Sequence, residues 1–356
     1  MPVPSVAPAI HLGNRAVGPG HPVYVIAELS ANHHQQYSRA VELVHAAAAA
    51  KTDAVKLQTY TADTMTIDID APAFRVKAGT PWSGRRLHEL YEEAMTPWDW
   101  QPRLKQEAEA LGMQCFSTPF DATAIDFLVQ MDVPAYKVAS FELVDLDLVR
   151  RVASVGRPVI LSTGMATAAE IDAAIDTARE AGATELALLR CNSAYPAPPD
   201  EMDLRAIPDM AARWKVPIGL SDHTLGTTAV IAAVALGATI IEKHLTLSRA
   251  DPGPDAGFSL EPDEFSAMVR GVREAEATLG EVRYGPSPSE TSSLTFRRSL
   301  FVVAAVDAGE PFSAANVRSI RPGHGLPPRF LPEVLGKRAT RRLEAGTPLL
   351  WDAIGD

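Results

Sequence analysis

The sequence predicts a (β/α)₈ barrel followed by a small, mostly β domain, and three observations carry this prediction. Eight short apolar runs recur between residues 23 and 243, and each ends in a polar residue. Helical patterns lie between most of these runs. The alternation stops after about residue 280. Continuous apolar strands that alternate with amphipathic helices are typical of a parallel sheet covered by helices.

The eight runs are the predicted strands of the barrel. In chain order they read VYVIAE (23–28), AVKLQT (54–59), MQCFST (113–118), AYKVAS (135–140), PVILST (158–163), LALLRC (186–191), PIGLSD (217–222) and ATIIEK (238–243). Eight such units in about 225 residues fit a closed barrel better than an open doubly wound sheet. No Gly-x-Gly-x-x-Gly follows the first run, which removes the main reason to prefer an open dinucleotide-binding sheet.

The segments between the strands predict helices and one long insertion. A helical pattern covers 38–51, and another covers 167–182. The second begins at a capping threonine, has acidic residues early and ends in glycine, as helices commonly do. The stretch 60–100 is long for a connection between a strand and the next helix. Connections of that length usually form functional lids or walls.

The composition change near residue 280 predicts a domain boundary. We expect the barrel in 1–280, a linker in 281–296 and a second domain in 297–356. The linker contains the Pro/Ser-rich stretch YGPSPSETSS. The second domain shows short β-like pieces with turns at DAGE and EAGTP, and a basic stretch, RSIRPGHG, at 318–325.

The totals exclude several classes of protein. A chain of 356 residues with 46% apolar and 22% charged residues is typical of a globular protein. The net charge of −11 argues against a nucleic-acid partner. No run reaches the roughly 18 apolar residues of a membrane span, and the N-terminus lacks the basic start of a signal peptide. Cys115 and Cys191 lie in apolar runs, which favours buried reduced thiols and a cytoplasmic location over a disulfide.

Polar side chains gather where the predicted strands end. They are Glu28, Lys56 with Gln58, Thr118, Lys137 with Ser140, Ser162, Asn192 with Tyr195, Ser221 with His223, and Glu242 with His244. The carboxyl ends of barrel strands form the active site in enzymes of this architecture. Lysines within strands are costly to bury unless an anion meets them. Lys56, Lys137 and the neighbouring hydroxyl groups therefore predict a cradle for phosphate and carboxylate groups.

Two histidines follow successive strands, in SDHT at 221–224 and EKHL at 242–245. Adjacent strands would bring His223 and His244 together, and two imidazoles near a carboxylate suit a divalent transition metal. The alternative is a pair of hydrogen-bonded structural histidines. His33 and His34 lie in a loop and are weaker candidates for metal ligation, and His324 is undecided.

An anion cradle beside a metal predicts an enzyme that joins or cleaves a phosphorylated compound and a carbonyl compound. Two other interpretations stay open at this point. One is a Schiff-base aldolase, in which Lys56 or Lys137 attacks a carbonyl group. The other is a non-catalytic glycan-binding protein, which would have no need of a metal beside an anion cradle.

The chain resembles the sialic acid synthase family, and the matching pieces run in the family's order over nearly the whole length. They are IAELSANH (26–33), DAVKLQT (53–59), FSTPFD (116–121), YKVAS (136–140), ILSTGMA (160–166), SAYPAP (193–198), GLSDHT (219–224), IEKHLTL (241–247), GPDAGFSLEP (253–262), RRSLFV (297–302) and RSIRPGHG (318–325). The resemblance implies a (β/α)₈ barrel followed by an antifreeze-protein-like (SAF) domain. It also implies a transferase that condenses phosphoenolpyruvate with an N-acylated amino sugar. The expected cofactor is a divalent metal, Mn²⁺ first and Mg²⁺ or Co²⁺ as alternatives, and the expected assembly is a domain-swapped homodimer.

Within the family, KLQTYTADTMTID (56–68) and MTPWDW (95–100) look most like pseudaminic acid synthases. The N-acetylneuraminate branch typically has Asn-His-Asn-Gly where this chain reads NHHQ at 32–35. The implied sugar is 2,4-diacetamido-2,4,6-trideoxy-altrose, and the implied products are pseudaminic acid and phosphate. N-acetylneuraminate or legionaminate synthesis is the alternative within the family.

The resemblance also implies what the site residues do. Glu28 and Glu242 would be catalytic, and His223 and His244 would bind the metal. Phosphoenolpyruvate would contact Lys56, Thr118, Lys137, Ser140, Ser162, Ser193 and Ser221. The sugar would contact Gln58, Tyr195 and Asp255, with Arg321 reaching it from the partner subunit.

Overall fold

The structure, a computed structural model, describes residues 7–77, 79–251 and 253–356. It divides at Gly280 into two compact units, a barrel unit and a small unit. The first six residues, on which part of the signal-peptide argument rests, lie outside this description. Within these ranges, no helix combines the length and the apolar character needed to cross a membrane.

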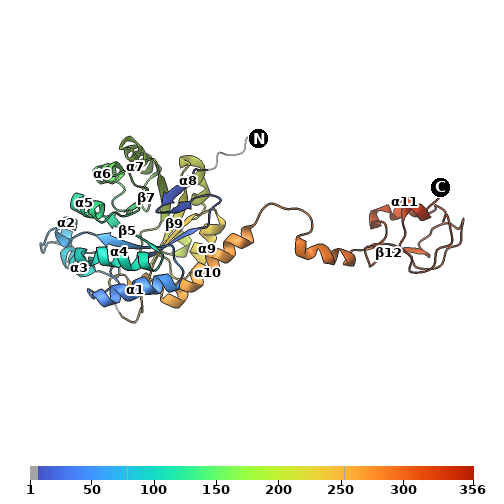
Figure 1. The fold of residues 1–356 in the computed structure, drawn as a ribbon, viewed down its shortest axis with the longest axis horizontal. Helices are drawn as coiled ribbons and strands as arrows, with labels where there is room; N and C mark the ends of the chain where they lie inside the picture. Colours follow the sequence, from blue (N-terminus) through green and yellow to red (C-terminus); the bar gives the residue numbers. More distant parts are fainter. Residues whose placement is uncertain (1–6, 78, 252) are drawn as a thin grey trace. The chain divides into compact units, whose positions relative to one another are not determined.

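The barrel unit is a closed barrel of parallel strands, in which the last strand, β10, pairs with the first, β3. All eight predicted runs form strands (Figure 1). The strands are β3 (Tyr24–Glu28), β4 (Ala54–Thr59), β5 (Gln114–Pro119), β6 (Tyr136–Val138), β7 (Val159–Ser162), β8 (Leu186–Cys191), β9 (Ile218–Asp222) and β10 (Ile240–His244). The closed barrel is the predicted architecture, and the open-sheet alternative is wrong.

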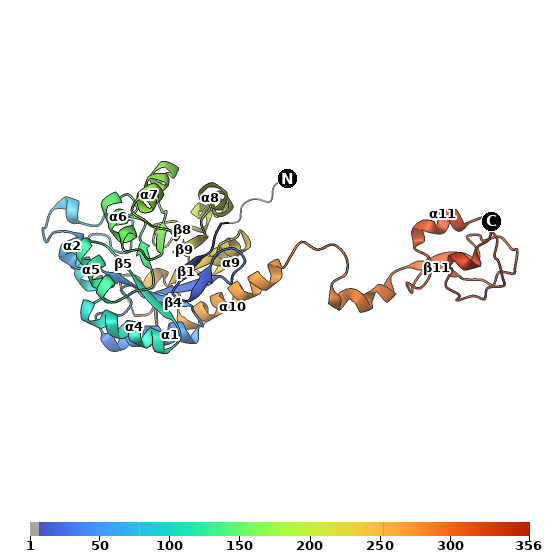
Figure 2. The ribbon, with the colours of Figure 1, turned by 45° about the horizontal axis from the view of Figure 1, so that its top comes forward.

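Helices surround the strands (Figures 1 and 2). They are α1 (Tyr37–Ala49), α4 (Gln101–Ala110), α5 (Ala122–Gln130), α6 (Leu146–Ser154), α7 (Ala168–Glu180), α8 (Ala206–Trp214), α9 (Thr228–Ala235) and α10 (Pro262–Leu279). Each turns an apolar stripe to the sheet, as α1 does with Ala40, Leu43, Val44 and Ala47. The predicted cap of α7 forms, because Thr167 accepts from the backbone of Glu170 and the Glu170 side chain accepts in return.

A short hairpin at the N-terminus had no sequence prediction. Strands β1 (Ile10–Leu12) and β2 (Arg15–Val17) pair antiparallel. Arg15 forms an ion pair with Asp53, which directly precedes β4, and Gly13 lies against Gln114 at the start of β5. The hairpin therefore covers the amino ends of the strands, opposite the end that carries the predicted site.

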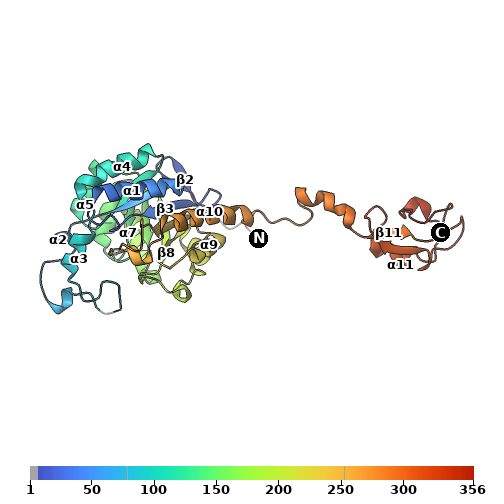
Figure 3. The same cartoon turned by 90° about the horizontal axis from the view of Figure 1, so that it is seen from below.

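The insertion between β4 and β5 forms its own small layer. It contains α2 (Ala62–Met65), α3 (Leu87–Ala94) and a hairpin-like turn between them (Figure 3). The turn is held by backbone bonds between Val76 and Arg85 at 2.9 Å and between Gly84 and Val76 at 2.9 Å. Ion pairs from Arg85 to Glu93 and from Arg86 to Asp68 fasten it to its surroundings.

The small unit has its own core, formed by residues such as Leu300, Phe312 and Leu349. Its strands β11 (Ser299–Val302) and β12 (Val317–Ile320) pair antiparallel. Other pairings are isolated bridges, so the unit has fewer regular strands than its sequence suggests. The predicted linker contains a 3₁₀ helix, Pro288–Phe296, which Ser287 and Glu290 cap. Ser287 thus satisfies a backbone group at the start of a helix that the sequence did not predict.

Candidate active site

A cavity of about 630 Å³ lies at the carboxyl ends of the barrel strands. Every predicted site residue of the barrel unit lines it: Glu28, Lys56, Gln58, Thr118, Lys137, Ser140, Ser162, Ser193, Tyr195, Ser221, His223, Glu242, His244 and Asp255. These residues come from all parts of the barrel sequence. Strand alternation points those within strands inward, whereas Ser140, Ser193, Tyr195, His223 and Asp255 lie in the loops that follow the strands. The structure thus brings together in one cavity residues that are up to about 230 positions apart.

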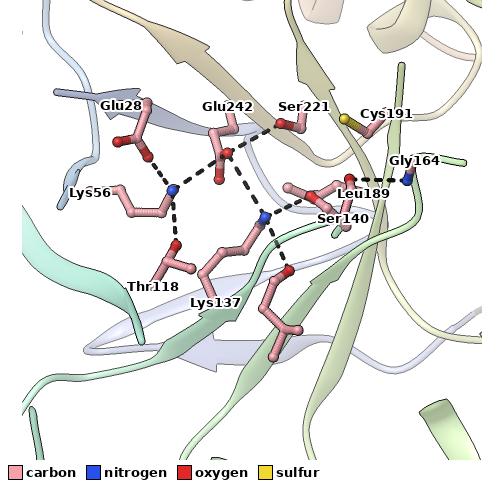
Figure 4. A network of polar contacts seen from close by, with 12 residues as sticks. Glu28, Lys56, Thr118, Lys137, Ser140, Gly164, Leu189, Cys191, Ser221 and Glu242 are labelled. Carbon is pink, nitrogen blue, oxygen red and sulfur yellow. Dashed lines mark hydrogen bonds and ion pairs between the residues drawn. The ribbon is translucent and has the colours of Figure 1, made fainter. Parts of the chain in front are cut away.

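Two lysines and two glutamates form a buried network on the floor of the cavity (Figure 4). Lys56 forms an ion pair with Glu28, and its Nζ lies 3.7 Å from Glu242 Oε1 and donates to Thr118 Oγ1 at 3.1 Å. Lys137 Nζ lies 3.9 Å from the same Glu242 oxygen. Equal numbers of positive and negative groups make it possible to bury all four.

The two glutamates differ in their electrostatics. Burial raises the pKa of Glu28, and the charge of Glu242 adds to this effect despite Lys56. Burial also opposes ionisation of Glu242, but Lys137 and Lys56 together bring the pKa of Glu242 below its ordinary value. Glu28 is therefore the better proton acceptor, and Glu242 is the carboxylate that stays charged between the lysines.

Hydroxyl groups extend this floor into a cradle beside Lys137. Lys137 Nζ donates to Ser162 Oγ at 2.6 Å, and the Gly164 amide donates to Ser140 Oγ at 3.1 Å. A Cβ atom at Gly164 would lie 2.3 Å from Ser193 Oγ, so only glycine leaves this space open. Ammonium, amide and hydroxyl donors around one open space suit a phosphate or carboxylate group.

The two predicted metal ligands, His223 and His244, lie next to each other in the cavity. The ring centroids of His223 and His244 are 5.3 Å apart. His223 Nδ1 lies 2.8 Å from the Asn192 carbonyl oxygen and donates to it, which leaves Nε2 as the nitrogen with a free lone pair. His244 Nδ1 is buried and has no hydrogen-bond partner within the described residues. The closest carboxylate oxygen, Asp255 Oδ2, is 3.9 Å from it.

The pKa values of the two histidines shift in opposite directions. Burial and the charge of His223 lower the pKa of His244 well below its usual value, so His244 is neutral, the form that ligates metals. Burial also disfavours the charged form of His223, but Cys191 and the Asn192 carbonyl raise its pKa. A metal would displace the extra proton of His223 on binding.

These residues fit a divalent metal. The described residues contain no group of three or more His, Cys, Asp and Glu side chains that could hold an ion by themselves. An ion here would take two imidazoles from the chain and complete its coordination with water or substrate oxygen atoms, as open catalytic sites do. The unpartnered Nδ1 of His244 is the observation that supports this fit.

Asp222, which directly precedes His223, does not line the cavity. Asp222 and Lys243 form an ion pair at 2.5 Å with fully buried side chains, on the opposite face of β9 and β10 from the histidines. Asp222 also accepts from the Thr224 amide at 2.9 Å. Asp222 thus joins the two strands behind the histidines instead of lining the cavity.

The predicted sugar-binding residues lie toward the outer part of the cavity. Gln58 donates to Ser30 Oγ at 2.8 Å, and Tyr195 packs on His223 with a centroid distance of 4.5 Å. Burial raises the pKa of Asp255. Arg321 lies in the small unit, directly after β12, and is exposed there.

The structure adds cavity residues that sequence reasoning missed. Glu142 lines the cavity, burial raises its pKa to about 7, and its Oε2 has no partner within the described residues. Cys191 is a free buried thiol, as predicted, but it also lines the cavity with Sγ 3.8 Å from His223 Nδ1. Its place as the last residue of a predicted strand was the available signal. Glu142 lies in a loop, and no local sequence pattern indicated that it would line the cavity.

Other candidates lie outside the cavity. His33 is buried against Trp100, and its Nε2 lies 3.2 Å from Thr96 Oγ1. Burial lowers its pKa to about 4. Asn192 directs its side-chain amide to the Glu201 carbonyl. His324 is exposed in the small unit. His33 and Asn192 thus stabilise loops around the site.

Comparisons with known proteins agree with this geometry. Residues 43–284 match the NeuB family, and residues 297–355 match the SAF domain. The chain is 42% identical to a pseudaminic acid synthase of Campylobacter jejuni, over 92% of this chain and 95% of the relative. It is 40% identical to a pseudaminic acid synthase of Helicobacter pylori, over 94% and 98%.

A solved structure also resembles this one. It is an N-acetylneuraminic acid (sialic acid) synthetase from Leptospira borgpetersenii in complex with citrate. The TM-score is 0.73 at 30% identity, and the match covers 81% of this chain and 96% of the other.

Proposed function

Since the chain belongs to the NeuB family, we propose that it is a transferase that condenses phosphoenolpyruvate with 2,4-diacetamido-2,4,6-trideoxy-altrose and water to form pseudaminic acid and phosphate. The similarity to two pseudaminic acid synthases supports the choice of sugar. The observation that carries the proposal is the single cavity in which an anion cradle, two glutamates and two facing histidines meet. A binding protein has no need of that combination.

The cradle would hold phosphoenolpyruvate. Lys56 and Lys137 would neutralise its charges, and Thr118, Ser140, Ser162, Ser193 and Ser221 would donate or accept hydrogen bonds around it. Burial makes these contacts strong because water does not screen them. The cradle would present C3 of phosphoenolpyruvate to the aldehyde carbon of the open-chain sugar, and a carbon–carbon bond would form there.

Glu28 would then activate water. Bond formation at C3 leaves positive charge at C2 of the former phosphoenolpyruvate, and Glu242 stays ionised nearby to stabilise it. Water adds at C2, and Glu28 takes the proton that this water loses, since its raised pKa makes it the stronger base. The tetrahedral product of this addition expels phosphate when the C–O bond between C2 and phosphate breaks, C2 becomes a ketone carbon, and the proton of its hydroxyl group leaves with the phosphate. The proton that Glu28 took passes to the former aldehyde oxygen, which becomes a hydroxyl group.

A divalent metal would be bound by His223 and His244, with Mn²⁺ as the first choice and Mg²⁺ or Co²⁺ as alternatives. When bound, it would polarise the aldehyde of the sugar. Gln58, Tyr195 and Asp255 would orient the sugar next to it.

The proposal extends to the assembly. In a domain-swapped homodimer the small unit of one subunit would bring Arg321 to the sugar site of its partner. The charges of the two units support such a contact: residues 281–356 contain ten Lys and Arg against eight Asp and Glu, so the barrel unit carries the whole acidic excess. The two buried, free thiols support a cytoplasmic location.

Two alternatives have support of their own. The similarity to a sialic acid synthetase structure supports N-acetylneuraminate as the product, and legionaminate is the other alternative within the family. Burial lowers the pKa of Lys137, which favours the Schiff-base aldolase. Reduction with borohydride in the presence of pyruvate or the sugar would trap that adduct.

The test is an assay of phosphate release from phosphoenolpyruvate with a panel of N-acyl amino sugars and added Mn²⁺. We expect release with the trideoxy sugar first and loss of release in EDTA. Release with no sugar of the panel would contradict the proposal, and a borohydride-trapped lysine adduct would favour the aldolase.

A further inference from the structure

The cavity has two chemically different ends. The strand ends supply the charged floor, whereas the insertion between β4 and β5 supplies an apolar side. Nine residues of that insertion line the cavity. Six of them, here called the apolar wall, are Met65, Val76, Leu87, Leu90, Tyr91 and Ala94, and the other three are Tyr60, Thr80 and Trp82. The proposed chemistry uses the floor and assigns nothing to this wall.

Helix α3 carries most of the wall on one stripe. Leu87, Leu90, Tyr91 and Ala94 follow the spacing of one helix face, and all four line the cavity. Leu90 is only 6% exposed, yet it does not belong to the apolar core of the barrel. The opposite face of the helix carries the exposed residues Glu89, Glu92 and Glu93. An apolar helix face that is turned to a cavity, instead of to the core, is built to contact something that enters the cavity.

The wall is held next to the reacting groups. The Trp82 indole, at the tip of the hairpin-like turn, donates to the Pro254 carbonyl at 2.6 Å. The same ring packs on Tyr195 with a centroid distance of 5.3 Å, and Tyr195 packs on His223. A chain of rings therefore places the insertion beside the proposed aldehyde site, within reach of a sugar that reacts there.

We infer that the apolar wall selects the sugar: it accepts the C6 methyl group and the acyl methyl groups of a deoxy, N-acylated substrate and disfavours a hydroxyl group at C6. This inference rests on the proposed function. A hydroxyl group placed against Leu87 or Leu90 would lose its water without gaining a hydrogen-bond partner. Discrimination of this kind between closely related groups in an apolar pocket amounts to roughly 10–200-fold.

The inference is tested most directly with two sugars that differ only in the oxygen atom at C6. We compare 2,4-diacetamido-2,4,6-trideoxy-altrose with its C6-hydroxylated counterpart, and measure kcat/KM by phosphate release and affinity by titration calorimetry. The wild-type chain should favour the deoxy sugar in both measurements. Leu87→Asn and Val76→Thr, which place polar atoms in the wall, should each narrow the ratio by about fivefold or more.

Ile67→Asn is the matched control, because Ile67 lies in the same insertion, is 56% exposed and does not line the cavity. It should leave the ratio unchanged, and thermal melting checks that all variants fold. Equal wild-type affinity for the two sugars, or an unchanged ratio in both folded wall variants, would overturn the inference. A wild-type chain that binds the deoxy sugar more tightly but releases no phosphate would support the inference and overturn the proposed reaction.

Discussion

At the scale of single residues, the site depends on charges that are buried together. Glu28, Lys56, Lys137 and Glu242 are each no more than 4% exposed. An isolated ionisable group at that depth would shift its pKa and become neutral. Here each group lies near a group of opposite charge, which favours its charged form. The charges of these four groups therefore sum to zero before an anionic substrate enters, and the lysines are already oriented by their carboxylate partners.

The histidine pair gives the first prediction. His223→Ala and His244→Ala each remove a direct metal ligand. Loss of a residue that only hydrogen-bonds to a ligand weakens metal affinity roughly 10–100-fold, so each of these changes should weaken Mn²⁺ binding by more than that. His244→Ala leaves no polar group unpaired, and His223→Ala loses one bond to a carbonyl at about 0.5–1.5 kcal/mol. Both chains should therefore fold. Calorimetric titration with Mn²⁺ measures the effect, and the exposed His45→Ala is the control. Wild-type affinity in either variant would refute the assignment.

Glu142 gives a prediction on pH. Burial raises its pKa to about 7, so the folded chain holds this proton more tightly than the unfolded chain does. Its contribution to stability is therefore greatest at low pH and declines as pH rises from the ordinary glutamate value through about 7. Glu142→Gln should gain about 2 kcal/mol of stability relative to wild type between pH 5 and pH 8.

Urea unfolding at the two pH values measures this gain. Glu274→Gln removes the same charge at an exposed position of α10 and serves as the control. A difference between Glu142→Gln and wild type that does not change with pH would show that the carboxyl group titrates normally.

At the scale of elements, the strand pair β9–β10 shows how the strand ends that carry the histidines are held in place. Ser221, Glu242 and His244 point into the cavity from these strands. On the outward face, Asp222 and Lys243 form a fully buried ion pair. Lys243 also donates to the Thr224 carbonyl. The ion pair ties together the two strand ends from which the histidines project.

Lys243→Met tests this element. Removing one partner leaves the Asp222 carboxylate buried and uncompensated, which should cost about 3–5 kcal/mol. Asp222→Asn in the same chain removes the charge while its amide oxygen can still accept from Thr224, so the double variant should recover at least half of the loss. Unfolding in urea gives both numbers. A double variant no more stable than Lys243→Met would show that the loss comes from packing and not from the unpaired charge.

At the scale of the whole molecule, the proposal of a swapped dimer makes the two units of one chain serve different sites. Arg321 is exposed in the small unit, and its planar donors suit recognition of a polar acyl group. If Arg321 acts across the interface, a mixed dimer of Arg321→Ala and His223→Ala chains has one site with both defects and one intact site. Re-formed mixtures should then recover close to half of the activity that a wild-type dimer shows.

Subunit exchange must be shown independently, for example with differently tagged chains. Each parent dimer alone is the control, and both should be inactive or strongly impaired. Activity that stays at the level of the parents, with exchange demonstrated, would mean that Arg321 serves its own barrel or no site at all.

The sequence by itself determined the barrel and much of the cavity. Strand residues alternate between two faces and each strand forms from a local run, so the ends of eight runs could be located and their inward residues named. The count of eight strand–helix units predicted a closed barrel. In a closed barrel β10 pairs with β3, and this pairing sets His244 opposite Glu28. Lys56, Lys137, Glu242 and both histidines were predicted on this basis.

Only the tertiary structure decided what surrounds those residues. Strand alternation places Asp222 and Lys243 on the outer face, but only the register between β9 and β10 sets them opposite each other as an ion pair. Glu142 lies in a loop and α3 lies in the insertion, and both line the cavity. The direction in which a loop or an insertion folds depends on its packing. The spacing of an apolar helix face shows that something covers it, but whether the core or a cavity does so is decided by contacts distant in sequence.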